Sequence, residues 1–184
     1  MKVLNIHERK FRASRQQVGA LIDSLSSPGD ALWPRHSWPR MRMDRPLGAG
    51  AAGGHGPVRY FVEEYSPGQS IRFRFTRPIG WDGFHGFAVV GADDSGTILR
   101  QTLQMVVRGP ALLSWPLVFR PLHDAVIEDS LTMAEASLGE PPNLRVWSYR
   151  VRFLRGILSG GRAARQRRPQ RPGCGGATGS VIRG

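Results

Sequence analysis

The chain has 184 residues, which is enough for one domain with a hydrophobic core and too few to favour two. Its net charge of +12 is unevenly distributed: the first 140 residues contain all 14 acidic residues and 16 lysines and arginines, whereas the last 44 contain ten arginines and no acid. The single cysteine, Cys174, excludes an intramolecular disulfide bond and a thiolate zinc site, and it favours a cytoplasmic protein.

The N-terminal segment predicts a strand followed by a short helix. Residues 2–13 alternate loosely, as a strand does, and they lack the apolar region of a signal peptide. Ser14 and Gln17 have the spacing of a capping box, in which each residue satisfies a backbone N–H of the other at the start of a helix. A helix over 15–26 is then predicted by apolar residues at helical spacing, which are Val18, Leu21, Ile22 and Leu25.

Two Trp-Pro pairs and a glycine cluster follow. Each proline restricts the preceding residue, Trp33 or Trp38, to extended or turn geometry, and the segment fits either a lid beside a cavity or an ordinary packed loop. The glycine-rich residues 53–56 roughly mimic a dinucleotide-binding fingerprint, but that fingerprint precedes a helix and these residues precede a strand. We therefore expect slack chain before a hairpin and no cofactor. His55 is expected to be a solvated loop residue or a gate.

Five more strands are predicted between residues 41 and 107. They cover 41–46, 57–65, 70–77, 83–92 and 96–107, with turns between them such as Ser66-Pro67-Gly68. Strands that follow one another through single turns form an antiparallel meander. Alternation directs one set of side chains toward the interior, and we expect these to line a binding site: Val58, Tyr60, Ile71, Phe73, Phe75, His85, Phe87, Leu99, Gln101, Leu103 and Met105.

The period becomes helical over residues 111–138. Phe119, Leu122, Val126 and Met133 form an apolar stripe, and the last three are expected to complete the lining. The longest apolar stretch, ALLSWPLVF, is too short to cross a bilayer. The predicted fold class is α+β, a curved antiparallel sheet closed by one long C-terminal helix. Such an arrangement tends to leave a cavity between its two layers.

Several of these segments together resemble a known superfamily. The order of elements, with GPVRYFVEEYSPGQSIRFRF, GFHGFAVV followed by GTILRQTLQM, and RPLHDAVIEDSLTMAEA, resembles the helix-grip (SRPBCC, START-like) superfamily of polyketide cyclases and lipid-transfer domains. The resemblance covers roughly residues 1–138 and is greatest to its uncharacterised bacterial members. It implies a sheet wrapped around a long helix, with an apolar small molecule held between them. No catalytic motif of the enzymatic members can be placed here, which counts against an enzyme.

Four polar side chains are expected at the apolar layer: His85 and Gln101 in the sheet, and His123 and Asp129 on the long helix. A carboxylate in such a place needs a partner or a raised pKa, so these groups are candidates for orienting a ligand hydroxyl or carbonyl. The alternative is structural, in which Asp129 bonds a backbone group or an arginine and each histidine makes one hydrogen bond. His123 and Asp124 point apart on a helix, so we expect no metal site.

The C-terminal part is separated from the body by two prolines at 141 and 142. Apolar residues recur at helical steps with arginines between them, which predicts a basic amphipathic helix over 144–158. These apolar residues are Leu144, Trp147, Val151, Leu154 and Leu158. Either the helix lies on an anionic membrane with Trp147 and the leucines inserted, or it packs back onto the body. Residues 160–184 are expected to be disordered, and nucleic acid is not favoured because no aromatic residue is interleaved for base stacking.

Three functions are consistent with these observations. The first is binding of an apolar or aromatic small molecule of lipid or polyketide type by a domain over 1–140. A basic helix over 141–159 and the tail follow this domain. The second is a polyketide cyclase or dehydratase in which His85 or His123, oriented by Asp129, acts as general acid and base. The third is an interaction protein that uses its basic tail. The sequence leaves the ligand and the oligomeric state open.

Overall fold

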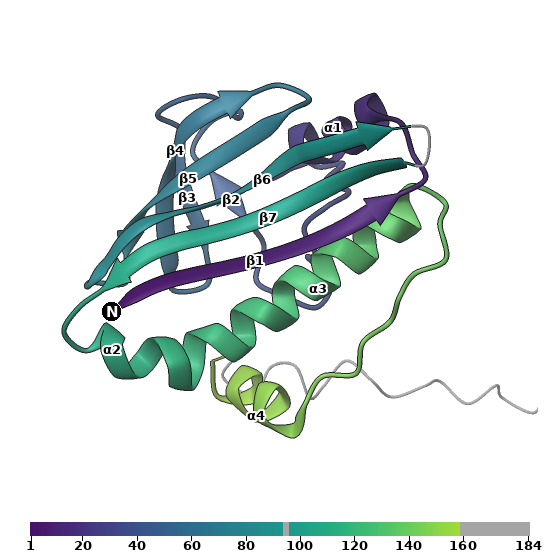
Figure 1. Ribbon diagram of the computed structural model, residues 1–184. Helices are drawn as coiled ribbons and strands as arrows, with labels where there is room; N and C mark the ends of the chain where they lie inside the picture. The colour runs from purple at the N-terminus through teal and green to yellow at the C-terminus, as the bar shows by residue number, and fades with distance from the viewer. Residues whose placement is uncertain (94–95, 159–184) are drawn as a thin grey trace, which may run out of the picture.

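The computed structural model describes residues 1–93 and 96–158, which form one seven-stranded sheet and several helices (Figure 1). The strands are β1 (Lys2–Phe11), β2 (Arg42–Met43), β3 (Ala52–His55), β4 (Val58–Ser66), β5 (Ser70–Arg77), β6 (Trp81–Asp93) and β7 (Gly96–Val107). The helices are α1 (Arg15–Ser24), α2 (Ala111–Ser114), the π-helical turn η1 (Trp115–Phe119), α3 (Arg120–Ser137) and α4 (Tyr149–Leu158).

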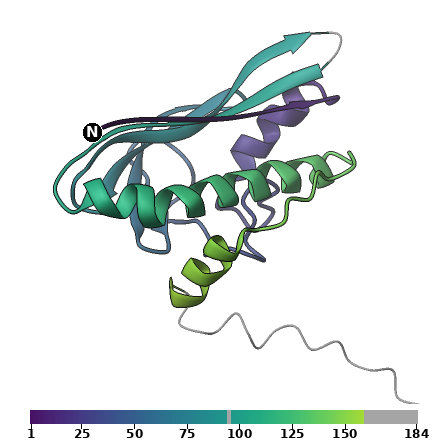
Figure 2. The same cartoon turned by 60° about the horizontal axis from the view of Figure 1, so that its bottom comes forward.

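The sheet is antiparallel, and its strands lie in the order β1-β7-β6-β5-β4-β3-β2. Strands β3 to β7 are neighbours in both sequence and space, as a meander requires, and β1 joins the sheet by pairing with β7. The sheet curves around α3, and α1 lies near one end of it (Figures 1 and 2). The predicted α+β class, with a curved sheet around a long helix, is therefore confirmed.

Inward-facing side chains of the sheet form the core together with one face of α3. Phe73 of β5 and Leu99 of β7 are completely buried, and they belong to the same apolar cluster as Leu131 and Ala134 of α3. Along β7 every second side chain from Thr97 to Val107 is buried. The period of two that the sequence shows is thus the period of burial in the structure.

The first helix has the predicted cap and packs closely on the sheet. Ser14 Oγ accepts a hydrogen bond from the Gln17 N–H at 3.3 Å, and Gln17 Oε1 accepts one from the Ser14 N–H at 3.0 Å. A Cβ added at Gly19 would lie 2.1 Å from the carbonyl oxygen of Gly68, in the turn between β4 and β5. Glycine at position 19 therefore permits α1 to contact this turn.

The glycine cluster forms strand β3, where the sequence predicted slack chain. Residues 52–55 pair with β4 on one side and with β2 on the other. A Cβ added at Gly53 would lie 2.0 Å from the carbonyl oxygen of Arg42, so the absence of a side chain allows β2 and β3 to approach. Strand β2 is only two residues long, shorter than the predicted 41–46.

The helical region predicted over 111–138 is divided into three parts. Pro116 has no N–H to donate to the preceding turn, and the chain widens into the π-helical η1 at this point. Helix α3 then runs for 18 residues and carries the face that closes the sheet.

The C-terminal helix begins at Tyr149, five residues after its predicted start. The irregular segment before it is attached to α3, because Asn143 O accepts from Thr132 Oγ1 at 2.9 Å and Asn143 N–H donates to Glu135 Oε2 at 2.6 Å. None of the described helices is both long and apolar enough to cross a bilayer. The predicted disordered tail over 160–184, and Cys174 within it, lie outside the described residues, and the domain boundary at residue 140 stays a prediction.

Candidate ligand-binding cavity

A cavity of about 750 Å³ lies between the sheet and α3 and is bordered by α4. The sheet and α3 contribute Val58, Phe75, Trp81, His85, Leu103, Leu122, His123 and Val126. His55, at the end of β3, also borders the cavity, and the surrounding loops, η1 and α4 contribute His36, Ser37, Trp38, Pro39, Gly56, Pro57, Phe119, Arg155 and Leu158. Its volume lies in the range of pockets that hold small organic molecules.

The structure brings part of the predicted lining to this cavity. Seven of the predicted residues border it: Val58, Phe75, His85, Leu103, Leu122, His123 and Val126. Another seven are buried in the core: Tyr60, Ile71, Phe73, Phe87, Leu99, Gln101 and Met105. Met133 is half-buried on α3. Alternation therefore identified inward-facing residues, whereas position along each strand decides which of them reach the cavity.

His85 lies in an aromatic environment on β6. Its ring stacks on Phe73 and Phe75, with centroid distances of 5.1 and 4.9 Å, and meets the edge of Tyr60 at 4.8 Å. Burial lowers the pKa of His85 well below its ordinary value, so the ring is neutral. Its Nε2 atom is buried and has no hydrogen-bond partner among the described residues. A ligand oxygen in the cavity would supply the missing partner.

His55 approaches the same cavity from β3. Its Nδ1 lies 2.9 Å from the hydroxyl of Tyr60, and its ring packs against Trp33 at 4.6 Å. Burial lowers the pKa of His55 to about 3, with smaller contributions from His123 and Arg59. The sequence placed His55 in a solvated loop or a gate, and it borders the cavity because the glycine cluster is a strand.

Two more polar side chains lie at this interior or next to it: Trp81 borders the cavity, and Gln101 lies in the core beside His123. The indole Nε1 of Trp81 is buried without a hydrogen-bond partner among the described residues, as is Oε1 of Gln101. Nε2 of Gln101 lies 3.3 Å from His123 Nε2, which fits an amide N–H donating to the ring nitrogen. Burial lowers the pKa of His123, and Asp124 opposes this only in part. The cavity thus combines apolar walls with neutral donors and acceptors.

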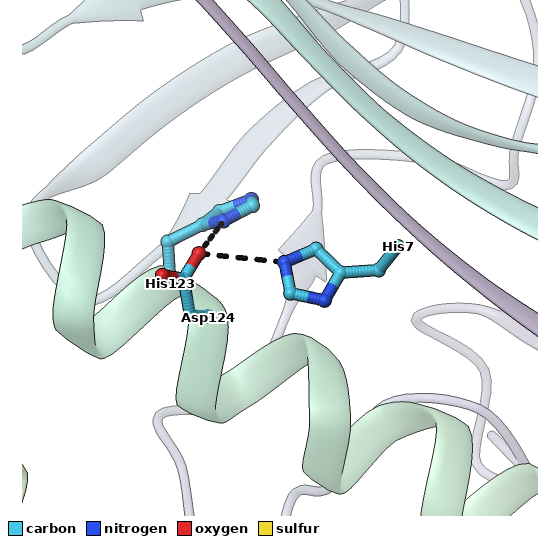
Figure 3. A group of neighbouring side chains, drawn as sticks. All are labelled: His7, His123 and Asp124. Carbon is cyan, nitrogen blue, oxygen red and sulfur yellow. Dashed lines mark hydrogen bonds and ion pairs between the residues drawn. The ribbon is translucent and has the colours of Figure 1, made fainter.

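His123 also belongs to a cluster at the edge of the cavity (Figure 3). Asp124 Oδ1 lies 3.7 Å from His123 Nδ1 and 3.3 Å from His7 Nε2, and it accepts a hydrogen bond from Asn5 Nδ2 at 2.8 Å. Burial alone would raise the pKa of Asp124, but the nearby His123 ring and the hydrogen bonds from His7 and Asn5 hold it below its ordinary value. His123 and Asp124 therefore belong to one cluster, although the sequence analysis expected these adjacent helix residues to point apart.

His7 connects this cluster to a second carboxylate. Its Nδ1 lies 2.8 Å from Glu128 Oε1, and Glu128 Oε2 accepts a hydrogen bond from Arg9 Nη2 at 2.9 Å. The hydrogen bond with Asp124 and that with Glu128 raise the pKa of His7, although burial opposes them. Strand β1 is thereby joined to α3 by charged groups.

The two histidines and Asp124 could in principle hold a metal ion. One atom from each of His7, His123 and Asp124 lies within 4.8 Å of the others, and two imidazoles with a carboxylate are ligands that zinc accepts. However, Asp124 already accepts hydrogen bonds from Asn5 and His7, and the bond with His7 holds that ring beside Asp124 without a metal ion.

Asp129 has a different environment from the one expected. Its Oδ2 accepts hydrogen bonds from the indole N–H groups of Trp38 at 2.7 Å and Trp147 at 2.9 Å. Burial raises the pKa of Asp129, and the two indole bonds oppose this. Among the described contacts Asp129 has no bond to His85 or His123. Its observed partners attach the Trp-Pro loop and the segment before α4 to α3.

Arg155 of α4 adds further contacts to this attachment. Its guanidinium lies over the ring of Trp147 at 3.9 Å and over that of Trp38 at 4.7 Å, and it donates to the carbonyl oxygen of Ser37. Arg155 and Trp38 both border the cavity. The sequence analysis offered Trp38 as part of a lid beside a cavity, but it missed Arg155, since nothing in the spacing of residues 144–158 indicates which of them face the body.

Solved structures show which fold this arrangement represents. A norcoclaurine synthase mutant from Thalictrum flavum, in complex with a transition-state analogue, is 15% identical with a TM-score of 0.54, over 76% of this chain and 96% of that one. CalU16 from Micromonospora echinospora is 13% identical with a TM-score of 0.54, over 89% and 96%. The chain has the helix-grip fold.

A third helix-grip match, a solution structure from Thermobifida fusca, is 17% identical with a TM-score of 0.57, over 77% of this chain and 97% of that one. No protein-family model and no curated protein matches the sequence. The resemblance inferred from the sequence is thus supported at the level of the fold. Several of these neighbours are covered almost completely, yet about a quarter of this chain is unmatched in two of them.

Proposed function

We propose that the protein binds an apolar small molecule, of aromatic or polyketide type, that carries a hydroxyl or carbonyl group. The observation that supports this is a cavity of about 750 Å³ whose lining residues include three buried polar atoms, His85 Nε2, Trp81 Nε1 and His123 Nδ1, without hydrogen-bond partners among the described residues. A buried polar group without a partner costs about 1–3 kcal/mol, and a ligand that supplies the bond recovers part of that.

The lining constrains the ligand further. His55, His85 and His123 all have lowered pKa values, so at neutral pH they offer uncharged donors and acceptors. Such groups suit hydroxyl and carbonyl oxygens better than a fully charged headgroup. The ligand therefore has an apolar body with its oxygens near His85 and Trp81.

Filling the cavity tests this proposal. Val126→Trp places an indole at a lining position and is expected to lower the affinity for an environment-sensitive apolar dye by on the order of tenfold or more. Val90→Trp is the matched control, because Val90 is exposed and does not border the cavity. Dye fluorescence titrations would be read beside circular dichroism. Unchanged dye affinity in a folded Val126→Trp variant would contradict the proposal.

A second candidate, general acid and base catalysis, is favoured by the contact of His123 with Asp124. With its Nε2 released from Gln101, a neutral His123 could remove a proton from the CH₂ group between two carbonyls, and the enolate carbon could then form a bond to a third carbonyl, whose oxygen takes the proton back. Asp124 replaces Asp129 as the orienting group in this version. His123→Gln should reduce cyclisation of a poly-β-ketone, followed by mass spectrometry, by on the order of 100-fold. An unchanged rate excludes His123.

A further inference from the structure

The outer face of α4 carries an apolar stripe that points away from the protein. Tyr149, Phe153 and Ile157 recur at four-residue spacing, and 88%, 68% and 62% of their surfaces are exposed. We call these three residues the outer stripe. On the opposite side of the same helix, Val151 is buried and Leu154 is half-buried. The helix is therefore apolar on two sides, and only one of them packs on the body.

The orientation of α4 is fixed by contacts on its inner side. Trp147 donates to Asp129, and Arg155 lies between Trp147 and Trp38. Arg150 donates to the carbonyl oxygen of Leu117 at 2.7 Å, which holds α4 beside η1. These bonds would have to break before the outer stripe could turn inward. Its exposure is thus a property of the folded state.

Two arginines of α4 lie next to residues of the outer stripe in the sequence, and no acidic residue follows Glu140. Arg150 and Arg152 are exposed on α4, and the guanidinium of Arg152 lies 6.0 Å from the centre of the Tyr149 ring. Arg150 bonds neutral carbonyls, and its guanidinium has no ion pair among the described residues. Six more arginines follow in residues 159–184. Aromatic and aliphatic side chains bordered by arginines match the interface of an anionic bilayer.

Further exposed apolar groups lie on α2 and η1. Leu113 and Leu117 are 70% and 54% exposed, and the bond from Arg150 brings Leu117 close to α4. A nucleic acid would be attracted by the arginines but would gain nothing from these aliphatic side chains. Exposed apolar side chains bordered by charged ones are typical of a docking site.

We propose that the protein docks on anionic lipid membranes through the outer stripe of α4, with Arg150 and Arg152 at the lipid headgroups. The sequence analysis left two alternatives open: a helix with Trp147 and the leucines inserted in a membrane, and a helix packed on the body. In the structure Trp147 is bonded to α3 and Leu154 is half-buried, so the lipid-facing residues are the other set on the same helix. This docking does not depend on what the cavity binds.

Vesicle co-sedimentation of the full chain tests the proposal. Wild-type protein is expected to bind vesicles of phosphatidylcholine with phosphatidylserine and to bind pure phosphatidylcholine much more weakly, with salt reducing the difference. Phe153→Asp combined with Ile157→Asp should weaken binding by on the order of tenfold or more. The control is Leu4→Asp with Ile6→Asp, which makes the same charge change at two exposed apolar residues of β1.

Three results would overturn the proposal. They are failure of the wild type to bind the anionic vesicles, unchanged binding by a folded Phe153→Asp/Ile157→Asp variant, and equal loss in the Leu4→Asp/Ile6→Asp control. Sedimentation velocity separates a protein partner from a lipid one: a dimer that depends on Phe153, without vesicle binding, assigns the stripe to self-association. Dye binding to the cavity should persist in every α4 variant, so failure here is distinguishable from failure of the proposed ligand function.

Discussion

Individual residues of the His7 cluster make the stability of this protein depend on pH. The folded-state pKa of His7 is raised by Asp124 and Glu128, so its stabilising contribution is present below the ordinary pKa of about 6.5 and is lost as the pH rises through the raised value. The pKa of Asp124 is lowered in the folded state, so its contribution is present above about 3.8 and is lost on further acidification.

Replacing His7 by asparagine should therefore destabilise the protein more at pH 6 than at pH 9. We expect a loss of about 1–3 kcal/mol at the lower pH, the scale of hydrogen bonds to charged groups, and a smaller loss at the higher pH. Urea denaturation at the two pH values measures the difference. His36→Asn, at an exposed histidine, should show no such trend. An equal loss at both pH values for His7→Asn would mean that the ring acts through packing alone.

At the scale of elements, α4 is held on the body by a small number of polar bonds. Trp147→Phe removes the indole N–H that Asp129 accepts and leaves the ring that Arg155 covers largely in place. We expect a loss of about 1–2 kcal/mol, with faster hydrogen exchange confined to residues 141–158. Tyr149→Phe, at an exposed ring, serves as the control. Unchanged exchange in Trp147→Phe would show that other contacts hold the helix.

The accuracy of the sequence-based predictions also differs between elements. The strands from residue 57 onward and the cap of α1 were predictable because alternation and the capping box are local signals. Strand β3 was not predictable, because it depends on the close approach of β2 to Gly53, and the sequence does not reveal that contact. Similarly, helical spacing predicted the helix near 144–158 but could not show that Val151 packs inward while Phe153 stays exposed.

At the scale of the whole molecule, the candidate site depends on contacts between distant segments. His85 and Gln101 were identifiable as inward-facing polar residues, because strand alternation applies to each strand separately. The pairing of His7 with Asp124, and of Asp129 with Trp38, joins residues 117 and 91 positions apart. No local pattern encodes such pairs. The sequence analysis therefore placed Asp129 with the histidines, whereas in the structure it helps to attach α4.

The pairing of β1 with β7 has a consequence for how the chain folds. Every backbone partner in this ladder is 86 or more residues away, since Phe11 lies opposite Thr97 and Lys2 opposite Val106. Pairing over such separations is slow, because the loop entropy is lost before the contacts form. During synthesis at about 5–20 residues per second, at least several seconds pass between the synthesis of β1 and that of β7. His7 and Arg9 place polar groups on the inner face of β1, which reduces the tendency of the unpaired segment to aggregate. After α3 has been synthesised, its carboxylates pair with these two residues.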